Sequence, residues 1–112
     1  MTAPAYLGEF EQLLLLAVLR LDADAYGFDI ARELETRAGR SISRGALYTS
    51  LDRLEHKGLL RWKTAAGASA RNGLPRRLYT VTPAGIAALS AARDTLRRMW
   101  RGIDHLFKEP TS

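Results

Sequence analysis

The sequence predicts an α+β fold that is mostly helical, with three short helices, a two-stranded hairpin and a long C-terminal helix. Three observations support this order. Apolar residues recur every three or four positions as far as residue 57. Two stretches then alternate between apolar and polar residues, and the final stretch returns to helical spacing. The length of 112 residues is that of one domain.

The first helix is predicted at residues 8–21, where apolar residues follow the i, i+3, i+4, i+7 rule. Leu15, Leu16 and Leu19 add a second apolar face, so this helix must be buried on two sides. In so small a domain, another chain could supply one of those sides. The second helix is predicted at about 26–38, and the glycine after it is a suitable C-terminal stop.

The third helix is predicted at residues 44–57. Ser43 is a good N-cap, and the glycine at position 58 ends the helix. Its inner stripe consists of Leu47, Leu51 and Leu54. The polar residues between these leucines cannot share that stripe, so they face away from the core and require another explanation.

Residues 59–64 and 76–82 alternate between apolar and polar side chains, which predicts two strands of a hairpin. The connection, residues 65–75, contains glycine and proline and reads as a long tip. From Arg61 to Arg77 there are five basic residues and no acidic one. The hairpin is therefore predicted to be strongly basic.

A final helix is predicted at residues 83–107, capped by Thr82 and with Pro83 at its first position. Its apolar residues repeat every seven positions over about three heptads, which is typical of a coiled-coil seam. So long a seam exceeds what one small domain can cover, and an identical chain is the simplest partner. We therefore expect a winged domain at residues 1–82 and a dimerisation helix with a short tail at 83–112.

Positive charge is concentrated in the middle of the chain. Residues 1–38 hold three basic and seven acidic side chains, and residues 78–112 hold five basic and three acidic ones. Residues 39–77 hold nine basic and only two acidic side chains. Focused positive charge favours a polyanion or an anionic surface as partner. A basic face kept for solubility is the alternative.

Several function classes are disfavoured. The chain has no cysteine, and its two histidines, His56 and His105, are far apart, so we expect no metal and no cofactor. No phosphate loop, nucleophile elbow or catalytic carboxylate pair is present, so we expect no catalytic residues and no enzyme. No apolar run reaches the ~18 residues needed to span a bilayer, and we expect a cytoplasmic protein.

Three helices followed by a basic hairpin form the layout of a winged helix-turn-helix. In that module the third helix enters the major groove of DNA and the hairpin lies against the backbone or minor groove. Other roles stay open for three residues: Tyr48 could pack against the first helix, Thr49 could be a neutral surface residue, and Arg53 could pair with an acid of its own helix. The predicted DNA contacts are Arg44, Gly45, Tyr48, Thr49, Arg53, Lys57, Lys63, Arg71, Arg76 and Arg77.

The motifs "SRGALYTSLDRLEHKGLL" and "LPRRLYTVTPAG", together with "LGEFEQLLLLAVLRL" and "AYGFDIARELE", resemble the PadR family of bacterial transcriptional regulators. The resemblance covers residues 7–108. With a single helix at its C-terminal end, the chain is similar to the short subgroup of the family. The resemblance implies a homodimer that binds a pseudo-palindromic operator in double-stranded DNA. Such a protein is associated with the nucleoid when it is bound to DNA, and it usually acts as a repressor that a small molecule releases. The resemblance implies that Tyr48 and Thr49 are recognition-helix contacts and that Arg76 and Arg77 are wing contacts.

The final helix also suggests an effector site. Large apolar groups near a two-fold axis can leave a gap between subunits that suits a flat aromatic or phenolic compound. The resemblance implies the same, although Trp100 could simply fill the dimer seam. The alternative function is a winged-helix protein–protein interaction module without specific DNA readout. Predicted dimer contacts are Leu15, Leu16, Leu89, Leu96, Met99, Ile103 and Leu106, and predicted effector contacts are Trp100, Met99 and Phe107.

Overall fold

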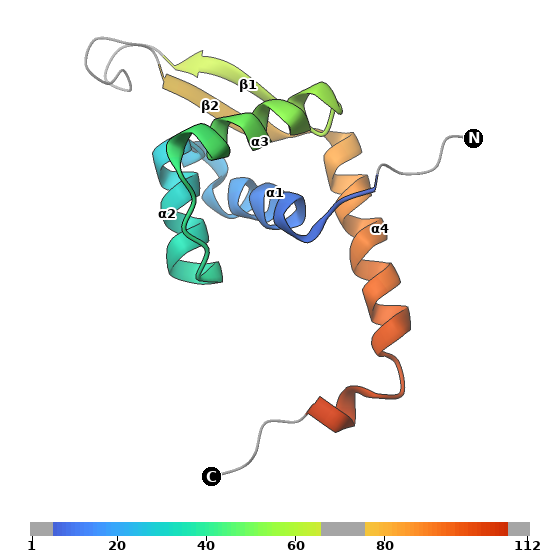
Figure 1. Ribbon diagram of the computed structural model, residues 1–112. Coiled ribbons are helices and arrows are strands. Elements are labelled where there is room, and N and C mark those ends of the chain that lie inside the picture. Colours follow the sequence, from blue (N-terminus) through green and yellow to red (C-terminus); the bar gives the residue numbers. More distant parts are fainter. Residues whose placement is uncertain (1–5, 66–75, 108–112) are drawn as a thin grey trace.

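The structure, a computed structural model, describes residues 6–65 and 76–107. Its elements follow the predicted order and confirm the α+β, mostly helical winged fold (Figure 1). The elements are α1 (Glu9–Leu21), η1 (Asp22–Asp24), α2 (Gly27–Ala38), α3 (Arg44–His56), β1 (Leu60–Ala65), β2 (Arg76–Val81), α4 (Pro83–Trp100) and η3 (Asp104–Phe107).

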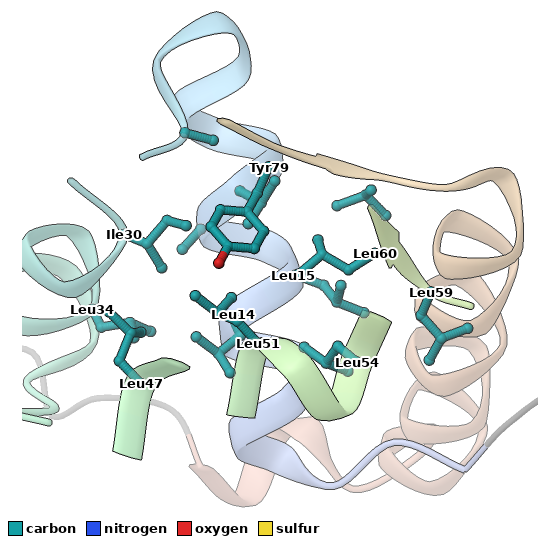
Figure 2. Packing of buried hydrophobic residues seen from close by; sticks show 14 of the residues in the cluster. Leu14, Leu15, Ile30, Leu34, Leu47, Leu51, Leu54, Leu59, Leu60 and Tyr79 are labelled. Atoms are coloured by element: carbon teal, nitrogen blue, oxygen red, sulfur yellow. The ribbon is translucent and has the colours of Figure 1, made fainter. Parts of the chain in front are cut away.

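The core lies where α1, α3 and the hairpin meet. Leu14 and Leu15 of α1 face Leu51 and Leu54 of α3, and the Tyr79 ring of β2 closes one side (Figure 2). Each of these side chains is 0 or 1% exposed. Burying one side chain of this size stabilises the fold by about 1.5–3 kcal/mol. The inner stripe predicted for the third helix is therefore confirmed.

Local capping fixes where α3 begins and ends. The Ser43 hydroxyl accepts a hydrogen bond of 3.2 Å from the backbone N–H of Ala46. At the other end, Gly58 has a φ of +75°, a conformation that glycine adopts without steric cost. The Leu59 N–H then donates to the Leu54 carbonyl, which closes the last turn.

The hairpin forms the wing and is attached to the start of α2. Its strands are antiparallel, and Trp62 pairs with Tyr79 across the sheet. The Tyr79 N–H donates to the Ala25 carbonyl at 2.9 Å, and Tyr26 forms an isolated bridge with Leu78. The wing therefore has a fixed position relative to the helix-turn-helix. Residues 66–75, which include the predicted tip and its Arg71, lie outside the described residues.

One threonine joins the end of α3 to the beginning of α4. The Thr82 hydroxyl donates to the Gly58 carbonyl at 2.7 Å and accepts from the Gly85 N–H at 3.1 Å. The backbones here are so close that a Cβ on Gly85 would collide with the Leu59 carbonyl. The direction of α4 is thus fixed by the winged domain.

The prediction of one continuous helix over residues 83–107 is wrong. Helix α4 ends at Trp100, and the chain turns at Arg101 and Gly102, whose φ is +88°. A short 3₁₀ helix, η3, follows this turn (Figure 1). Glycine favours this left-handed conformation and is a poor helix former, so a seven-residue apolar repeat did not suffice to continue the helix.

In the described part of the chain, no helix is long and apolar enough to cross a membrane. No group of three or more potential metal ligands occurs there either.

Candidate nucleic-acid interface

Helix α3 buries one face and exposes the other. The buried face is the leucine stripe, whereas Arg44, Gly45, Thr49 and Arg53 are all exposed, as predicted from their spacing. The exposed face contains hydroxyl, guanidinium and backbone groups of the kind that bind phosphates and base edges. This face is available for an external partner.

Gly45 lies in the first turn of α3 and has open space around it. A Cβ placed there would have no protein atom within 4 Å among the described residues. Glycine lowers helix stability relative to alanine, by up to about 1 kcal/mol in a helix interior, so it is costly where the fold does not need it. Here the fold has no steric need for glycine, which leaves room for a partner to approach the helix backbone.

Tyr48 is half-buried and packs against the start of α2. Its phenol lies over Gly27, and a Cβ at that position would collide with the ring and its hydroxyl. The contact locks α3 against α2 and sets where the phenol points. Tyr48 therefore has a structural role in addition to the predicted DNA contact.

The basic residues of the wing lie on both faces of its two-stranded sheet. Lys63 of β1 is exposed. Its cross-strand partner is Leu78, so it lies on the opposite sheet face from Trp62 and Tyr79. Arg76 and Arg77 are neighbours on β2 and therefore lie on opposite faces.

Arg76 ties the wing to α2. One of its guanidinium nitrogens lies 3.4 Å from Asp29 Oδ2, and both side chains are about two-thirds covered. The guanidinium carbon lies 3.9 Å from the centre of the Tyr26 ring. Cation–π and charge contacts of this kind hold the side chain in place.

Arg77 ties the wing to α3 in the same manner. Its NH1 lies 3.3 Å from Asp52 Oδ1, and its guanidinium carbon lies 4.1 Å from the centre of the Trp62 ring. Beside it, burial raises the pKa of the Tyr79 phenol, and the nearby Arg77 charge opposes that shift. Tyr79 thus stays protonated at neutral pH.

Lys57 lies beyond the end of α3 and is bound to α1. Its Nζ donates to Glu11 Oε2 at 2.7 Å, and the Glu11 side chain is only 16% exposed. This pair fastens the third helix to the first. A DNA contact by Lys57 would compete with it.

The predicted dimer residues divide into three groups. Leu15 is fully buried in the core of its own chain, so its assignment to a dimer contact is wrong. Leu89 is half-buried and packs against the same core. The third group is exposed to solvent and consists of Leu16, Leu96, Met99, Ile103 and Leu106.

A groove of about 790 Å³ lies between α1 and α2. Its apolar lining comes mainly from leucine and alanine side chains, and charged side chains rim it. The lining residues are Glu9, Leu13, Leu16, Ala17, Leu19, Arg20, Glu33, Leu34, Arg37, Ala38 and Arg40.

The predicted effector residues lie at the end of α4 and in η3. Trp100 and Phe107 contact each other edge to face, with ring centroids 4.9 Å apart, because the turn at Gly102 folds η3 back. Met99 is largely exposed. The Trp100–Phe107 pair lies on the surface of the described chain, since the two residues are 41% and 61% exposed.

Residues 15–91 match the Transcriptional regulator PadR-like family. The chain belongs to this family. The family consists of transcriptional regulators rather than enzymes, in agreement with the sequence-based prediction. The exposed face of α3 and the basic wing thus belong to a PadR-like transcriptional regulator.

Relatives extend this result. The chain is 38% identical over 82 residues to the transcriptional regulator Rv3488 of Mycobacterium tuberculosis, covering 73% of this chain and 72% of that protein. It is 27% identical to a PadR family transcriptional regulator from Eggerthella lenta, with a TM-score of 0.63 over 91% of this chain and 88% of the other. A Clostridium difficile PadR family regulator, 22% identical, shares the fold with a TM-score of 0.67 over 90% of this chain and 100% of the other.

Sequence reasoning missed the acidic and aromatic partners of the wing arginines. Asp29 and Asp52 lie 47 and 25 positions away from their arginines, so local spacing does not reveal the pairs. One signal was available: adjacent residues of a strand point to opposite faces, so Arg76 and Arg77 could not have the same neighbours.

Proposed function

We propose that this PadR-like regulator binds duplex DNA sequence-specifically, with α3 in the major groove and the wing against the backbone. The observation that carries the proposal is the outer face of α3, which is exposed, polar and open around Gly45. The major groove is about 12 Å wide and admits one helix. A regulator of chromosomal DNA would act in the bacterial cytoplasm.

Binding to duplex DNA as a function of salt tests this proposal. Counterion release gives a steep loss of affinity with salt for a DNA-binding protein, whereas a protein–protein module has no such dependence on DNA phosphates. Lys63→Ala should reduce the salt slope by about one unit on every sequence. Arg93→Ala, which removes an exposed charge from α4, is the matched control and should leave the slope unchanged.

Sequence readout requires a second comparison. Thr49→Ala should weaken binding to the operator more than binding to random DNA, by about 1–3 kcal/mol if a base edge is contacted. If operator and random DNA are affected equally, α3 contacts phosphates only and the protein does not read sequence.

The proposed regulator is a homodimer in which the end of α4 packs against α1 of a second copy. The groove between α1 and α2 has an apolar lining, and the large apolar side chains beyond Arg93 remain 41–72% exposed in the single chain. Two-fold symmetry would place two recognition helices on one side of the duplex, with half-sites about 10 base pairs apart. Sedimentation equilibrium at micromolar concentration should give twice the chain mass of 12.4 kDa. A monomer would contradict the proposal.

An aromatic or phenolic effector that releases a repressor from DNA completes the proposed function. Trp100 is 41% exposed and carries Phe107 on one edge, so a flat ligand could stack on the indole near the two-fold axis. A Trp62→Phe variant leaves Trp100 as the single tryptophan for fluorescence titration. Planar aromatic compounds should quench it below about 100 µM, a modest affinity. No quenching, or an unchanged DNA response in Trp100→Ala, would place the effector elsewhere.

A further inference from the structure

An acidic residue lies on the exposed face of α3. Asp52 follows Thr49 by three positions and Gly45 by seven, so all three lie on the same side of the helix. The Asp52 side chain is 53% exposed. A carboxylate on a face that approaches phosphates opposes binding by charge repulsion. The unfavourable charge of Asp52 on this face therefore has to be offset by a favourable interaction.

In the free protein the compensation comes from the wing. Arg77 reaches Asp52 Oδ1 from β2 at 3.3 Å, while its guanidinium lies over the Trp62 ring. Trp62 is itself packed against the core, so it provides a fixed platform. Both charged side chains remain close to half exposed, which means that the ion pair can open without disturbing the core.

We propose that Asp52 is a specificity-determining residue for DNA. This inference rests on the proposed function. A carboxylate and a backbone phosphate bind the same N–H groups of a guanidinium, so the Arg77–Asp52 pair competes with any phosphate that Arg77 would contact. Binding in the major groove exchanges one anion for another at Arg77 and releases the carboxylate of Asp52 toward the bases.

The released carboxylate separates matching from non-matching sequences. It accepts hydrogen bonds only, and in the major groove the donors are the amino groups of cytosine and adenine. Where the duplex presents such an amino group, Asp52 regains a partner. Where it presents the oxygen of guanine or thymine, Asp52 is left unpaired beside phosphates. Random DNA therefore carries a penalty that the operator avoids.

Asp52→Asn tests this inference, because asparagine has the same shape without the charge and offers a donor as well as an acceptor. Its affinity for random duplex DNA should rise about fivefold, with a salt slope steeper by about one unit. Operator affinity should change less, so the ratio of the two affinities should fall. Operators selected from a randomised duplex library should lose a base preference at one position in each half-site.

Two controls separate this mechanism from general electrostatics. Glu55 lies on the same helix, and its charge also acts on Arg77, but no hydrogen bond joins the two residues in the structure. Glu55→Gln should therefore shift binding to random DNA much less than Asp52→Asn does. In an Arg77→Gln background, Asp52→Asn should lose most of its effect, because the competing pair no longer exists.

Three results would overturn the inference while leaving the proposed function intact. These are unchanged or weaker binding of random DNA by Asp52→Asn, an equal effect of Glu55→Gln, and an undiminished effect in the Arg77→Gln background. Failure of the wild-type protein to bind duplex DNA would overturn both. Melting temperatures of all variants should match the wild type within a few degrees, because Asp52 and Arg77 are exposed and Glu55 is partly exposed.

Discussion

The winged domain and the C-terminal segment from Arg93 to Phe107 contain similar apolar residues in opposite environments. Leu51 in the winged domain is fully buried, whereas Leu106 in the segment is 68% exposed. Every residue from Arg93 to Phe107 is exposed. The winged domain thus closes its core with its own side chains. The segment leaves its apolar side chains exposed to solvent, which is typical of an interaction surface.

The same contrast occurs within α1. Leu15 and Leu16 are adjacent in sequence, yet the first is 0% and the second 45% exposed. The residue type does not distinguish an internal contact from an external one; the position on the helix does. Four predictions test the difference between the closed and the open surfaces.

The largest expected effect is on the closed core. Leu51→Ala should lower the free energy of unfolding by about 2–5 kcal/mol, because it removes packed methyl groups and leaves a cavity. Urea denaturation at a fixed protein concentration measures the change. Leu106→Ala is the control and should cost much less. Equal losses would mean that the segment is as tightly packed as the core.

The next effect concerns assembly. Leu96→Glu should dissociate the proposed dimer, since placing a charge in an apolar interface costs several kcal/mol unless it finds a partner. Sedimentation should then give a monomer, and circular dichroism should retain the helical signal of the winged domain. Arg97→Glu changes the neighbouring exposed residue and serves as the comparison. A Leu96→Glu dimer of unchanged stability would exclude α4 from the interface.

A smaller effect is expected where two helices of the winged domain touch. Gly27→Ala places a methyl group against the Tyr48 ring, and overpacking of this kind costs about 1–3 kcal/mol. The ring has to swing away, so operator binding should weaken as in Tyr48→Ala. Denaturation and DNA titration of the two variants measure both effects. A fully stable Gly27→Ala variant would mean that the α2–α3 contact adapts easily.

The smallest effect has the opposite sign. Gly45→Ala should leave stability unchanged or raise it by up to about 1 kcal/mol, because alanine favours helix and the added methyl meets open space. DNA affinity should nevertheless fall, since the methyl group occupies room on the proposed contact face. Stability gained without any loss of DNA affinity would show that the duplex does not approach this turn.

The sequence predicted the winged fold closely because its signals are local. The leucine stripe of α3, the Ser43 cap and the Gly58 stop depend on neighbours within one or two turns, and each was found as expected. The end of α4 was missed. There the heptad repeat predicts a continuous helix, whereas Gly102 in a left-handed conformation ends it.

The candidate site was predicted in part for the same reason. Exposure of Arg44, Gly45, Thr49 and Arg53 follows from helical periodicity. The partners of Tyr48 and the wing arginines come from elements distant in sequence, and only the packed fold brings them together. Sequence spacing therefore identifies which side chains are exposed on the helix surface. The tertiary structure decides which of them already contact other residues of the same chain.

The junction at Thr82 couples the orientation of α4 to that of α3. Because Thr82 bonds the Gly58 carbonyl and caps α4, and because Gly85 packs directly on the Leu59 carbonyl, the helix cannot pivot independently of the end of α3. Its 18 residues give an arm of about 27 Å at 1.5 Å per residue. By simple geometry, a tilt of about 5° at the winged end then displaces Trp100 by about 2 Å, and the reverse coupling holds equally. Small angular changes at the far end of α4 are thereby converted into rotation of α3, the helix proposed to contact DNA.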